Sequence, residues 1–508
     1  MSDVASAAPP AAPAGEVYVA ETELQAGAIG FWGGMIQAVT HIAPGLNILL
    51  GLTFIVSFVG VNAPIAYILG GIICLGVAVV LTQLAKEFTG AGGYFLYISR
   101  TFGSFGKVVG SRFGWITTWL YFLYDPVAVS SVCAFTGLLV QDTVKAQYGV
   151  KISWYIWFFV FLAVVTAFTL FGIALSVKAM LLLGGLEVGI FFALGFSGLV
   201  SPGPGGFNAS SFNPGHLHNF NSIYLAVVFT ILALSGFEAV APISEETENP
   251  RRNLPIVIVG STILVATFYA LVNWGVLVGQ GTTSVAAGKF TNSDQVFDLA
   301  RRLWGGAWLI VLIATVNSAL AVAIAIQNAS TRVFFSMGRI GALPRWLAYV
   351  HPRWKTPWNA IMGLTVITVV LAMWLGSWIG PVNQFGMIGI VQTIGLIIVY
   401  CMGNIGATIY YRREKKREFN LWLHGVIPLA TSAALIWVLW KTVEGLHPIA
   451  LNNAFDYAPW IALTWFVAGL VILFYAGRTG KEEWLFKAGE VAHERSETRD
   501  ELTHRPAL

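Results

Sequence analysis

The sequence predicts an all-α integral membrane protein with about 12 transmembrane helices. Of its 508 residues, 56% are hydrophobic and only 11% are charged, which is too apolar for a soluble chain of this length. The apolar residues form stretches of roughly 20, the length that a helix needs to cross a hydrocarbon core of about 30 Å. Glycine (54 residues) and tryptophan (19 residues) fit close helix packing and aromatic anchors at the membrane surface.

Each expected span is an apolar stretch that is bounded by polar or turn-forming residues. In chain order the expected spans cover residues 27–57, 63–85, 112–140, 152–172, 178–200, 221–246, 255–279, 307–336, 357–377, 382–411, 421–441 and 457–477.

The distribution of Lys and Arg predicts how these spans are oriented. With the N-terminus in the cytoplasm, six of the 29 basic residues fall on the opposite side, namely Lys145, Lys151, Lys289, Arg301, Arg302 and Lys441. The remaining 23 fall in cytoplasmic segments, the side on which short membrane loops retain basic residues. We therefore expect a multi-pass protein of the cell membrane with both termini in the cytoplasm.

The terminal segments and the cysteines give no sign of secretion. Residues 1–25 lack the basic start and the short apolar core of a signal peptide, so we expect a disordered cytoplasmic tail, with a second cytoplasmic tail at 481–508. Cys74, Cys133 and Cys401 lie in apolar runs, and their odd number indicates no disulfide framework. Basic residues are not interleaved with aromatic residues in a stripe, so no nucleic-acid partner is expected.

Two of the expected spans are interrupted near their middles. The first contains Pro44 and Gly45, and the sixth contains Gly236 within the sequence Ser-Gly-Phe-Glu at 235–238. Neither Pro nor Gly favours a continuous helix, because Pro removes a backbone donor and Gly loosens the backbone. Unwound backbone in a bilayer is tolerated only where protein or a water-filled cavity satisfies its polar groups. The two breaks therefore predict a substrate site near the membrane midplane.

A site of this kind suits a zwitterion. The N-termini of half-helices direct backbone N–H groups at an anionic group, and the carbonyls of the unwound ends accept an ammonium group. For Pro44 and Gly45 taken alone, a simple kink in a packed helix is the alternative. The predicted substrate-binding residues are His41, Ile42, Ala43, Pro44, Gly45, Tyr124, Ser235, Gly236 and Phe237.

Three motifs resemble one transporter family. The Ser-Gly-Phe-Glu step, followed by Ile-Ser-Glu-Glu-Thr-Glu-Asn-Pro-Arg-Arg-Asn-Leu-Pro at 243–255, is similar to the sixth-helix signature of the amino acid/polyamine/organocation (APC) superfamily. Glu-Phe-Thr-Gly-Ala-Gly-Gly-Tyr at 87–94 and Met-Gly-Arg-Ile-Gly-Ala-Leu-Pro at 337–344 match further motifs in the same order. The resemblance implies that residues 26–480 form an APC-type transporter domain.

The resemblance implies a LeuT-type 5+5 inverted repeat with broken helices 1 and 6, plus two extra C-terminal helices. It also implies uptake or exchange of amino acids or related amines. The family's carboxylate-binding breaks fall on Ala43-Pro44-Gly45 and on Ser235-Gly236-Phe237. Many members have a Gly-Ser-Gly type of break in the first helix, whereas this proline-containing break resembles a subgroup that includes polyamine and amine importers.

Two carboxylates lie deep in apolar spans. Asp125 precedes Pro126 in the third span, and Glu187 lies halfway along the fifth. A charge at the bilayer centre costs at least roughly 2.5 to 3.5 kcal/mol, so such residues are functional candidates. The resemblance places Glu187 at a position that holds a lysine in many proton-coupled or sodium-independent relatives. We predict ion coupling at Glu187 and Asp125, through a proton in preference to sodium. The alternatives are a hydrogen bond to a neighbouring helix for Glu187 and a structural bond near Pro126 for Asp125.

The other polar candidates are weaker. His41 either titrates or satisfies freed backbone groups, and Glu238 either supports the second break or contacts substrate. Asn317 and Ser318 either face a cation or form ordinary interhelical hydrogen bonds. The acidic residues between 245 and 248 are expected to form a solvated connector, with ion pairs to Arg251 and Arg252 as the alternative.

The sequence thus predicts a secondary active transporter for amino acids that works by alternating access, by proton symport or by exchange. The alternative substrate is a polyamine or another organic amine. A membrane-embedded enzyme is a remote alternative, because no metal cluster, phosphate-binding loop or nucleophile motif is present. A transporter-like sensor is another. No cofactor, catalytic residue or bound metal is expected, and the expected partners are substrate, proton or sodium, and membrane lipid.

Overall fold

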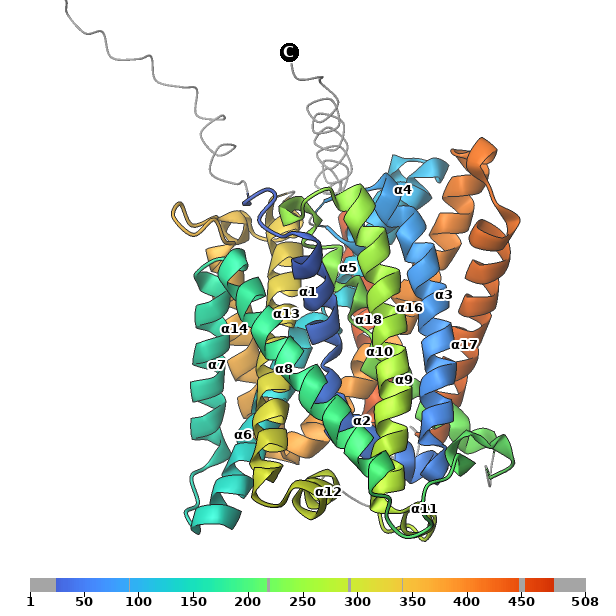
Figure 1. Ribbon diagram of the computed structural model, residues 1–508. Coiled ribbons are helices and arrows are strands. Elements are labelled where there is room, and N and C mark those ends of the chain that lie inside the picture. The colour runs from blue at the N-terminus through green and yellow to red at the C-terminus, as the bar shows by residue number, and fades with distance from the viewer. Residues whose placement is uncertain are drawn as a thin grey trace, which may run out of the picture.

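The computed structural model describes residues 24–90, 92–216, 220–290, 294–339, 341–446 and 453–478. These residues form a bundle of long helices that run between two ends (Figure 1). The α-helices are α1 (Phe31–Ile42), α2 (Pro44–Val59), α3 (Ala63–Glu87), α4 (Tyr94–Phe102), α5 (Lys107–Tyr121), α6 (Asp125–Tyr148), α7 (Trp154–Leu170), α8 (Ile173–Val200), α9 (Phe220–Leu234), α10 (Pro250–Gln280), α11 (Thr282–Ala286), α12 (Asp294–Trp304), α13 (Leu309–Arg339), α14 (Trp358–Leu371), α15 (Ser377–Ile379), α16 (Pro381–Arg413), α17 (Ile427–Gly445) and α18 (Ala458–Arg478).

Nine helical stretches in the described part of the chain are long and apolar enough to cross a membrane. The first, Phe31–Glu87, contains two of the spans expected from the sequence. Two shorter apolar helices, Trp154–Leu170 and Ala226–Val240, lie where the fourth and sixth spans are expected. The protein is therefore an all-helical, multi-pass membrane protein in its described residues, while the count of 12 spans and the 5+5 repeat stay predictions.

The described chain begins and ends at the same end of the bundle, the upper end in Figure 1, which we call the terminal end. The short α4 lies there, and α11 and α12 lie at the opposite end. The tails expected at 1–25 and 481–508 fall almost entirely outside the described residues. Leu24 is described, and it is buried against Phe335, Ala348 and Val350.

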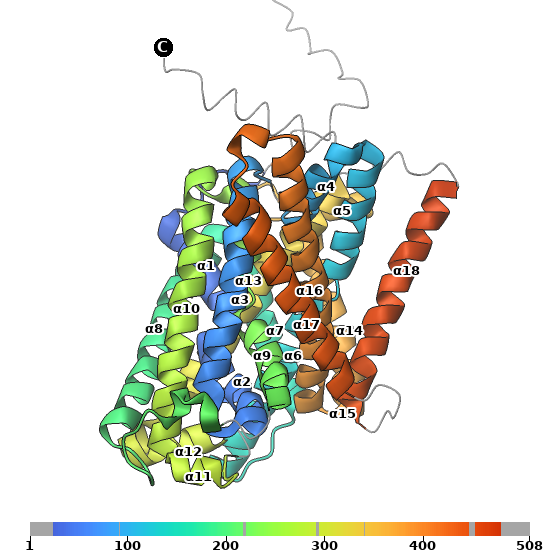
Figure 2. The same cartoon turned by 90° about the vertical axis from the view of Figure 1, so that its right-hand side faces the viewer.

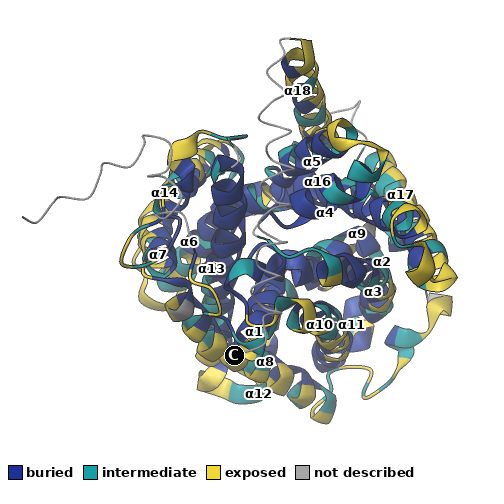
Figure 3. Ribbon diagram, turned by 90° about the horizontal axis from the view of Figure 1, so that it is seen from above, coloured by how far each residue is buried: buried dark blue, intermediate teal, exposed yellow. Residues whose placement is uncertain are grey.

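The buried residues concentrate in the centre of the bundle. Seen along the helices, α1, α9, α13 and α16 are mostly buried, while the outer faces of α7, α8, α14 and α17 are exposed (Figure 3). α18 leans away from the rest of the bundle (Figure 2). The exposed apolar side chains on the outer helices are those that a bilayer would cover. The centre is thus the part of the fold that encloses polar groups.

Small residues allow two of these helices to touch through their backbones. Gly195 and Gly198 on α8 face Gly275 and Gly279 on α10, and a Cβ atom on Gly198 would overlap the carbonyl oxygen of Gly275. Helix pairs in membranes approach this closely only through such residues. The contact fixes α8, which carries Glu187, against the core of the bundle.

Candidate functional site

The first break lies between α1 and α2. α1 ends at Ile42, Ala43 has left-handed backbone angles (φ 54°, ψ 63°), and Pro44 is the first residue of α2. A residue before proline is kept out of the right-handed helical region, and proline itself is well suited to a first helical position. The sequence Ala43-Pro44 therefore ends one helix and starts the next within a single span.

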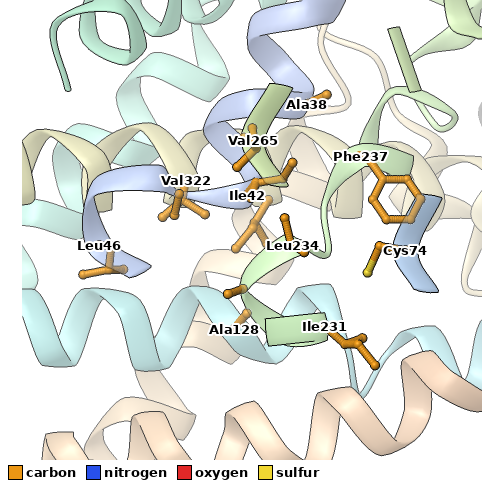
Figure 4. Packing of buried hydrophobic residues seen from close by; sticks show 14 of the residues in the cluster. Ala38, Ile42, Leu46, Cys74, Ala128, Ile231, Leu234, Phe237, Val265 and Val322 are labelled. Carbon is orange, nitrogen blue, oxygen red and sulfur yellow. The ribbon is translucent and has the colours of Figure 1, made fainter. Parts of the chain in front are cut away.

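The second break follows α9. α9 ends at Leu234, Gly236 has a φ of 124°, and Phe237–Val240 form a short 3-10 turn instead of a second α-helix. Gly236 packs directly against the first break, since a Cβ atom there would lie 2.9 Å from the carbonyl carbon of His41 and 3.0 Å from the backbone nitrogen of Ile42. Figure 4 shows Ile42 and Leu234 next to each other between the two broken helices. The two breaks thus meet at one place, as the sequence predicts.

Side chains from α2, α10 and α13 satisfy the backbone of the first break. Asn47 Nδ2 donates to the carbonyl oxygen of Ile42 at 2.6 Å, and the Tyr269 hydroxyl donates to the same oxygen at 3.1 Å. The backbone nitrogen of Leu46, in the first turn of α2, donates to Ser318 Oγ at 3.0 Å. The break is therefore held in place by α2, α10 and α13.

A cavity of about 70 Å³ lies beside the two breaks. Of the predicted substrate-binding residues, His41, Ile42, Ala43, Tyr124 and Ser235 border it, and so does Asp125. Pro44, Gly45, Gly236 and Phe237 do not border the cavity, and they shape the backbone of the breaks. The remaining lining residues, which were not singled out from the sequence, are Leu46, Asn47, Ala128, Ser131, Val132, Leu232, Val322, Ile326, Phe385, Gly389 and Gln392.

Asp125 is the acidic residue that borders this cavity. It occupies the first turn of α6, because residues 122–124 form a turn that separates α6 from α5 inside the third expected span. His41 Nε2 lies 3.0 Å from Asp125 Oδ1, and the Tyr121 hydroxyl donates to Oδ2 at 2.6 Å. The carboxylate is thus tied to α1 and to α5, and His41 pairs with Asp125 through its side chain.

Glu238 forms a clamp across the second break. Its Oε1 accepts hydrogen bonds from the hydroxyls of Tyr124 and Tyr400, both at 2.9 Å, and its Oε2 accepts one from the backbone nitrogen of Gly236 at 2.9 Å. Three donors suit an ionised carboxylate. Glu238 therefore supports the unwound segment, one of the two roles expected for it, and joins the second break to α16.

Glu187 is fully buried on α8, next to the first break and outside the lining of the cavity. α8 contacts α1 closely at this level, because a Cβ atom on Gly184 would lie 2.6 Å from Thr40 Cγ2. Ser318 is a polar neighbour of the Glu187 carboxyl group, yet neither carboxyl oxygen has a hydrogen-bond partner among the residues described. The alternative of a hydrogen bond to a neighbouring helix would have Ser318 on α13 as its partner, and it stays a prediction.

The other weak candidates form interhelical contacts. Asn317 Nδ2 donates to the carbonyl oxygen of Leu183 on α8 at 2.6 Å, and Ser318 accepts from α2. These are the ordinary hydrogen bonds that the sequence left as one of two options. Within the ranges given above, no group of three or more His, Cys, Asp or Glu residues could hold a metal ion.

The expectation of a solvated acidic connector after the sixth span is wrong for Glu246. Glu246 and Arg332 are both fully buried, with Nε–Oε2 and Nη2–Oε1 distances of 2.9 and 3.2 Å. Glu245 pairs with Arg339 at 2.8 Å, and the backbones of Ile29 and Thr247 form a parallel bridge. The partners lie on α13, about 90 residues away in the sequence, so local charge patterns gave no sign of them.

The buried ion pair leads to a stability prediction. Arg332→Met should destabilise the protein by about 3 to 5 kcal/mol, because it leaves the Glu246 charge buried without a partner. Adding Glu246→Gln to Arg332→Met should recover part of this loss. Arg339→Met is the matched control and should cost only about 0 to 1 kcal/mol, since its pair with Glu245 is partly exposed. Thermal unfolding of the purified variants in detergent measures these differences, and equal midpoints for Arg332→Met and Arg339→Met would contradict the prediction.

Comparison with known proteins identifies the family to which the chain is similar. A family model described as "Amino acid permease" matches residues 29–477. The chain is 24% identical over 457 residues to the branched-chain amino acid permease BcaP of Bacillus subtilis, covering 86% of this chain and 90% of that protein. It is 24% identical over 420 residues to the glutamate/serine transporter AimA of the same organism, covering 78% and 75%. It is 25% identical over 244 residues to the methylthioribose transporter of Bacillus subtilis, covering 46% and 48%.

Proposed function

Because the chain belongs to the amino acid permease family of the APC superfamily, we propose that it is a secondary active transporter that moves amino acids across the cell membrane by alternating access. The observation that carries the proposal is the cavity beside the two breaks. Unwound helices beside a cavity are the arrangement by which transporters bind a solute at the midplane. The proposed orientation places both termini, and hence the terminal end, in the cytoplasm.

The two helix ends at the cavity suit the two charged groups of an amino acid. The N-terminal end of α2, at Ala43 and Leu46, has the positive pole of its dipole there and favours the substrate carboxylate. The C-terminal end of α9, at Leu232 and Ser235, has the negative pole and favours the ammonium group, which Asp125 also attracts. The backbone nitrogen of Gly236 takes no part, because Glu238 accepts its hydrogen bond.

The side chain of the substrate is proposed to be uncharged. The cavity lining includes the apolar residues Ala128 and Val132 on α6 and Val322 and Ile326 on α13, with Ser131 and Gln392 as further polar groups. Asp125 is assigned to the α-ammonium group and His41 is paired with Asp125, so a second carboxylate or a second ammonium on the substrate would find no further charged partner in this lining. An organic amine is the second candidate, because Asp125 borders the cavity and would attract a cation.

We therefore expect neutral α-amino acids to compete for uptake and putrescine not to compete. The measurement is uptake of labelled amino acids into liposomes that contain the purified protein, with a panel of unlabelled amino acids and amines as competitors. Protein-free liposomes are the control for leakage. Competition by putrescine but not by any α-amino acid would reverse the order of the two candidates, and the absence of uptake for every compound would contradict the transporter proposal.

The coupling ion is proposed to be a proton, with Glu187 and Asp125 as the exchanging groups. An ionised carboxylate that is buried without a partner is costly, so Glu187 is proposed to carry a proton in this conformation. Glu187 lies next to the first break, so gain or loss of its proton would act on the backbone of the substrate site. Sodium is the alternative ion, and it would need several oxygen ligands around it, in the way that other hard cations do.

A further inference from the structure

Asp125 also borders a second, smaller cavity on the side facing the terminal end. This cavity has a volume of about 20 Å³, and its polar lining residues are Tyr94, Thr117, Thr118, Tyr121, Asp125 and Glu238. Gly92, Phe95 and Pro242 border it as well. Asp125 lies between the two cavities and borders both, whereas Glu238 borders only the smaller one.

The smaller cavity is large enough for one water molecule, and its lining combines apolar residues with several polar ones. A buried water needs about 10 to 15 Å³ of such space and two to four polar partners. The two carboxylates supply acceptors, and Tyr94 supplies a hydroxyl that has no hydrogen-bond partner in the part of the chain described. That hydroxyl is buried and lies close enough to Glu238 to interact with it electrostatically.

Resting on the proposed function, we propose that this cavity binds a water molecule that relays a proton between Asp125 and Glu238. In the relay, protonated Asp125 gives its proton to the water oxygen while the water gives one of its own protons to a Glu238 oxygen. The water is regenerated, and the net result is one proton moved from Asp125 to Glu238. Tyr94 holds the water in line with the two carboxylates, so it is a positioning residue.

The titratable groups around the relay come from five elements. His41 on α1 pairs with Asp125, and Tyr121 on α5 donates to it. Tyr124 before α6 and Tyr400 on α16 donate to Glu238, and Cys74 on α3 lies near Glu238. Asp125 and Glu238 both belong to the lining of the cavity.

The relay would connect the substrate cavity to the clamp at the second break. An ionised Glu238 accepts three hydrogen bonds, and protonation turns one of its oxygens into a donor. Protonated Glu238 can then accept fewer hydrogen bonds from Tyr124, Tyr400 and Gly236, which weakens the clamp. Opening toward the terminal end therefore follows when Asp125, which borders the substrate cavity, releases its proton.

The test compares Tyr94, which borders the cavity, with Tyr97, which does not. Tyr94→Phe should lower the maximal rate of amino-acid exchange between liposomes and medium, at equal pH on both sides, by at least about fivefold, which is about 1 kcal/mol. The half-saturating substrate concentration should stay unchanged. The ratio of the exchange rate in H2O to that in D2O should differ between the variant and the wild type. Tyr97→Phe is the control, because Tyr97 is also buried, its hydroxyl has no hydrogen-bond partner among the described residues, and it does not border the cavity. Thr118→Val, which removes another polar wall of the cavity, should act in the same direction as Tyr94→Phe.

The outcomes separate this inference from the proposed function. Wild-type liposomes that exchange no amino acid would contradict the transporter proposal. Wild-type exchange together with equal rates for Tyr94→Phe and Tyr97→Phe would overturn the relay alone. An experimental structure that resolves buried waters should show one within hydrogen-bond distance of Asp125, and a dry cavity in that structure would also overturn the relay.

Discussion

Gly236→Ala should abolish substrate binding and transport, because the added Cβ atom has no room at the point where the two breaks meet. It would lie 2.7 Å from His41 Cδ2 and 2.9 Å from the carbonyl carbon of His41, and backbone cannot move aside as a side chain can. The φ of 124° adds strain of about 1 to 3 kcal/mol for any residue other than glycine. Gly236→Leu should have the same effect or a larger one. The measurement is equilibrium binding of the best competing amino acid to the purified variant.

Two further glycines calibrate this prediction. Gly185→Ala on α8 is the matched control and should bind as wild type, since no described atom beyond its own stretch of helix lies within 4 Å of the position of its Cβ. Gly45→Ala should fall between the two, because its Cβ would meet the Phe191 side chain at 2.6 Å, whereas Gly45→Leu should also abolish binding. Binding by Gly236→Ala within about threefold of wild type, or roughly 0.7 kcal/mol, would count against the site. Size-exclusion profiles separate lost binding from lost folding.

The two breaks could be predicted from sequence because their causes are local. A proline after Ala43 and a glycine at 236 act on the backbone where they stand, whatever the rest of the chain does. The acidic residues Asp125 and Glu187 were also visible, since a carboxylate in an apolar span is conspicuous by itself. The positions of the two breaks therefore agree with the sequence analysis, while the use of the cavity beside them as a substrate site stays a prediction.

The partners of these residues could not be predicted, because they come from distant segments. Tyr400 reaches Glu238 across 162 residues, and Arg332 reaches Glu246 across 86. The sequence around Glu246 predicts a solvated connector, but Glu246 is buried because α13 supplies Arg332 as its partner. The turn at residues 122–124 was also unexpected, since Pro126 alone indicates a kink and not a separate helix. Tertiary packing decided each of these details, and a local pattern does not encode it.

Glu187→Gln should remove concentrative uptake while leaving exchange intact. One proton that moves down a gradient of about one pH unit contributes about 1.4 kcal/mol, which supports roughly tenfold accumulation of substrate. Glutamine has nearly the same shape as a protonated glutamate, so the packing of α8 behind the first break is kept, but it cannot release a proton. With an inward proton gradient, no sodium and a clamped membrane potential, wild type should accumulate labelled amino acid about tenfold, and Glu187→Gln should reach only equal concentrations inside and outside.

Glu187→Asp tests whether the carboxyl group itself is what matters. It retains a group that exchanges protons at this place, so it should recover accumulation above that of Glu187→Gln, although its shorter side chain lies further from Ser318 and the first break. Exchange of internal for external amino acid, measured at equal pH, checks that each variant still binds and moves substrate. Accumulation by Glu187→Gln as steep as that of wild type would make Glu187 structural. Asp125 is then the leading coupling group, because it is the buried carboxylate that borders both cavities.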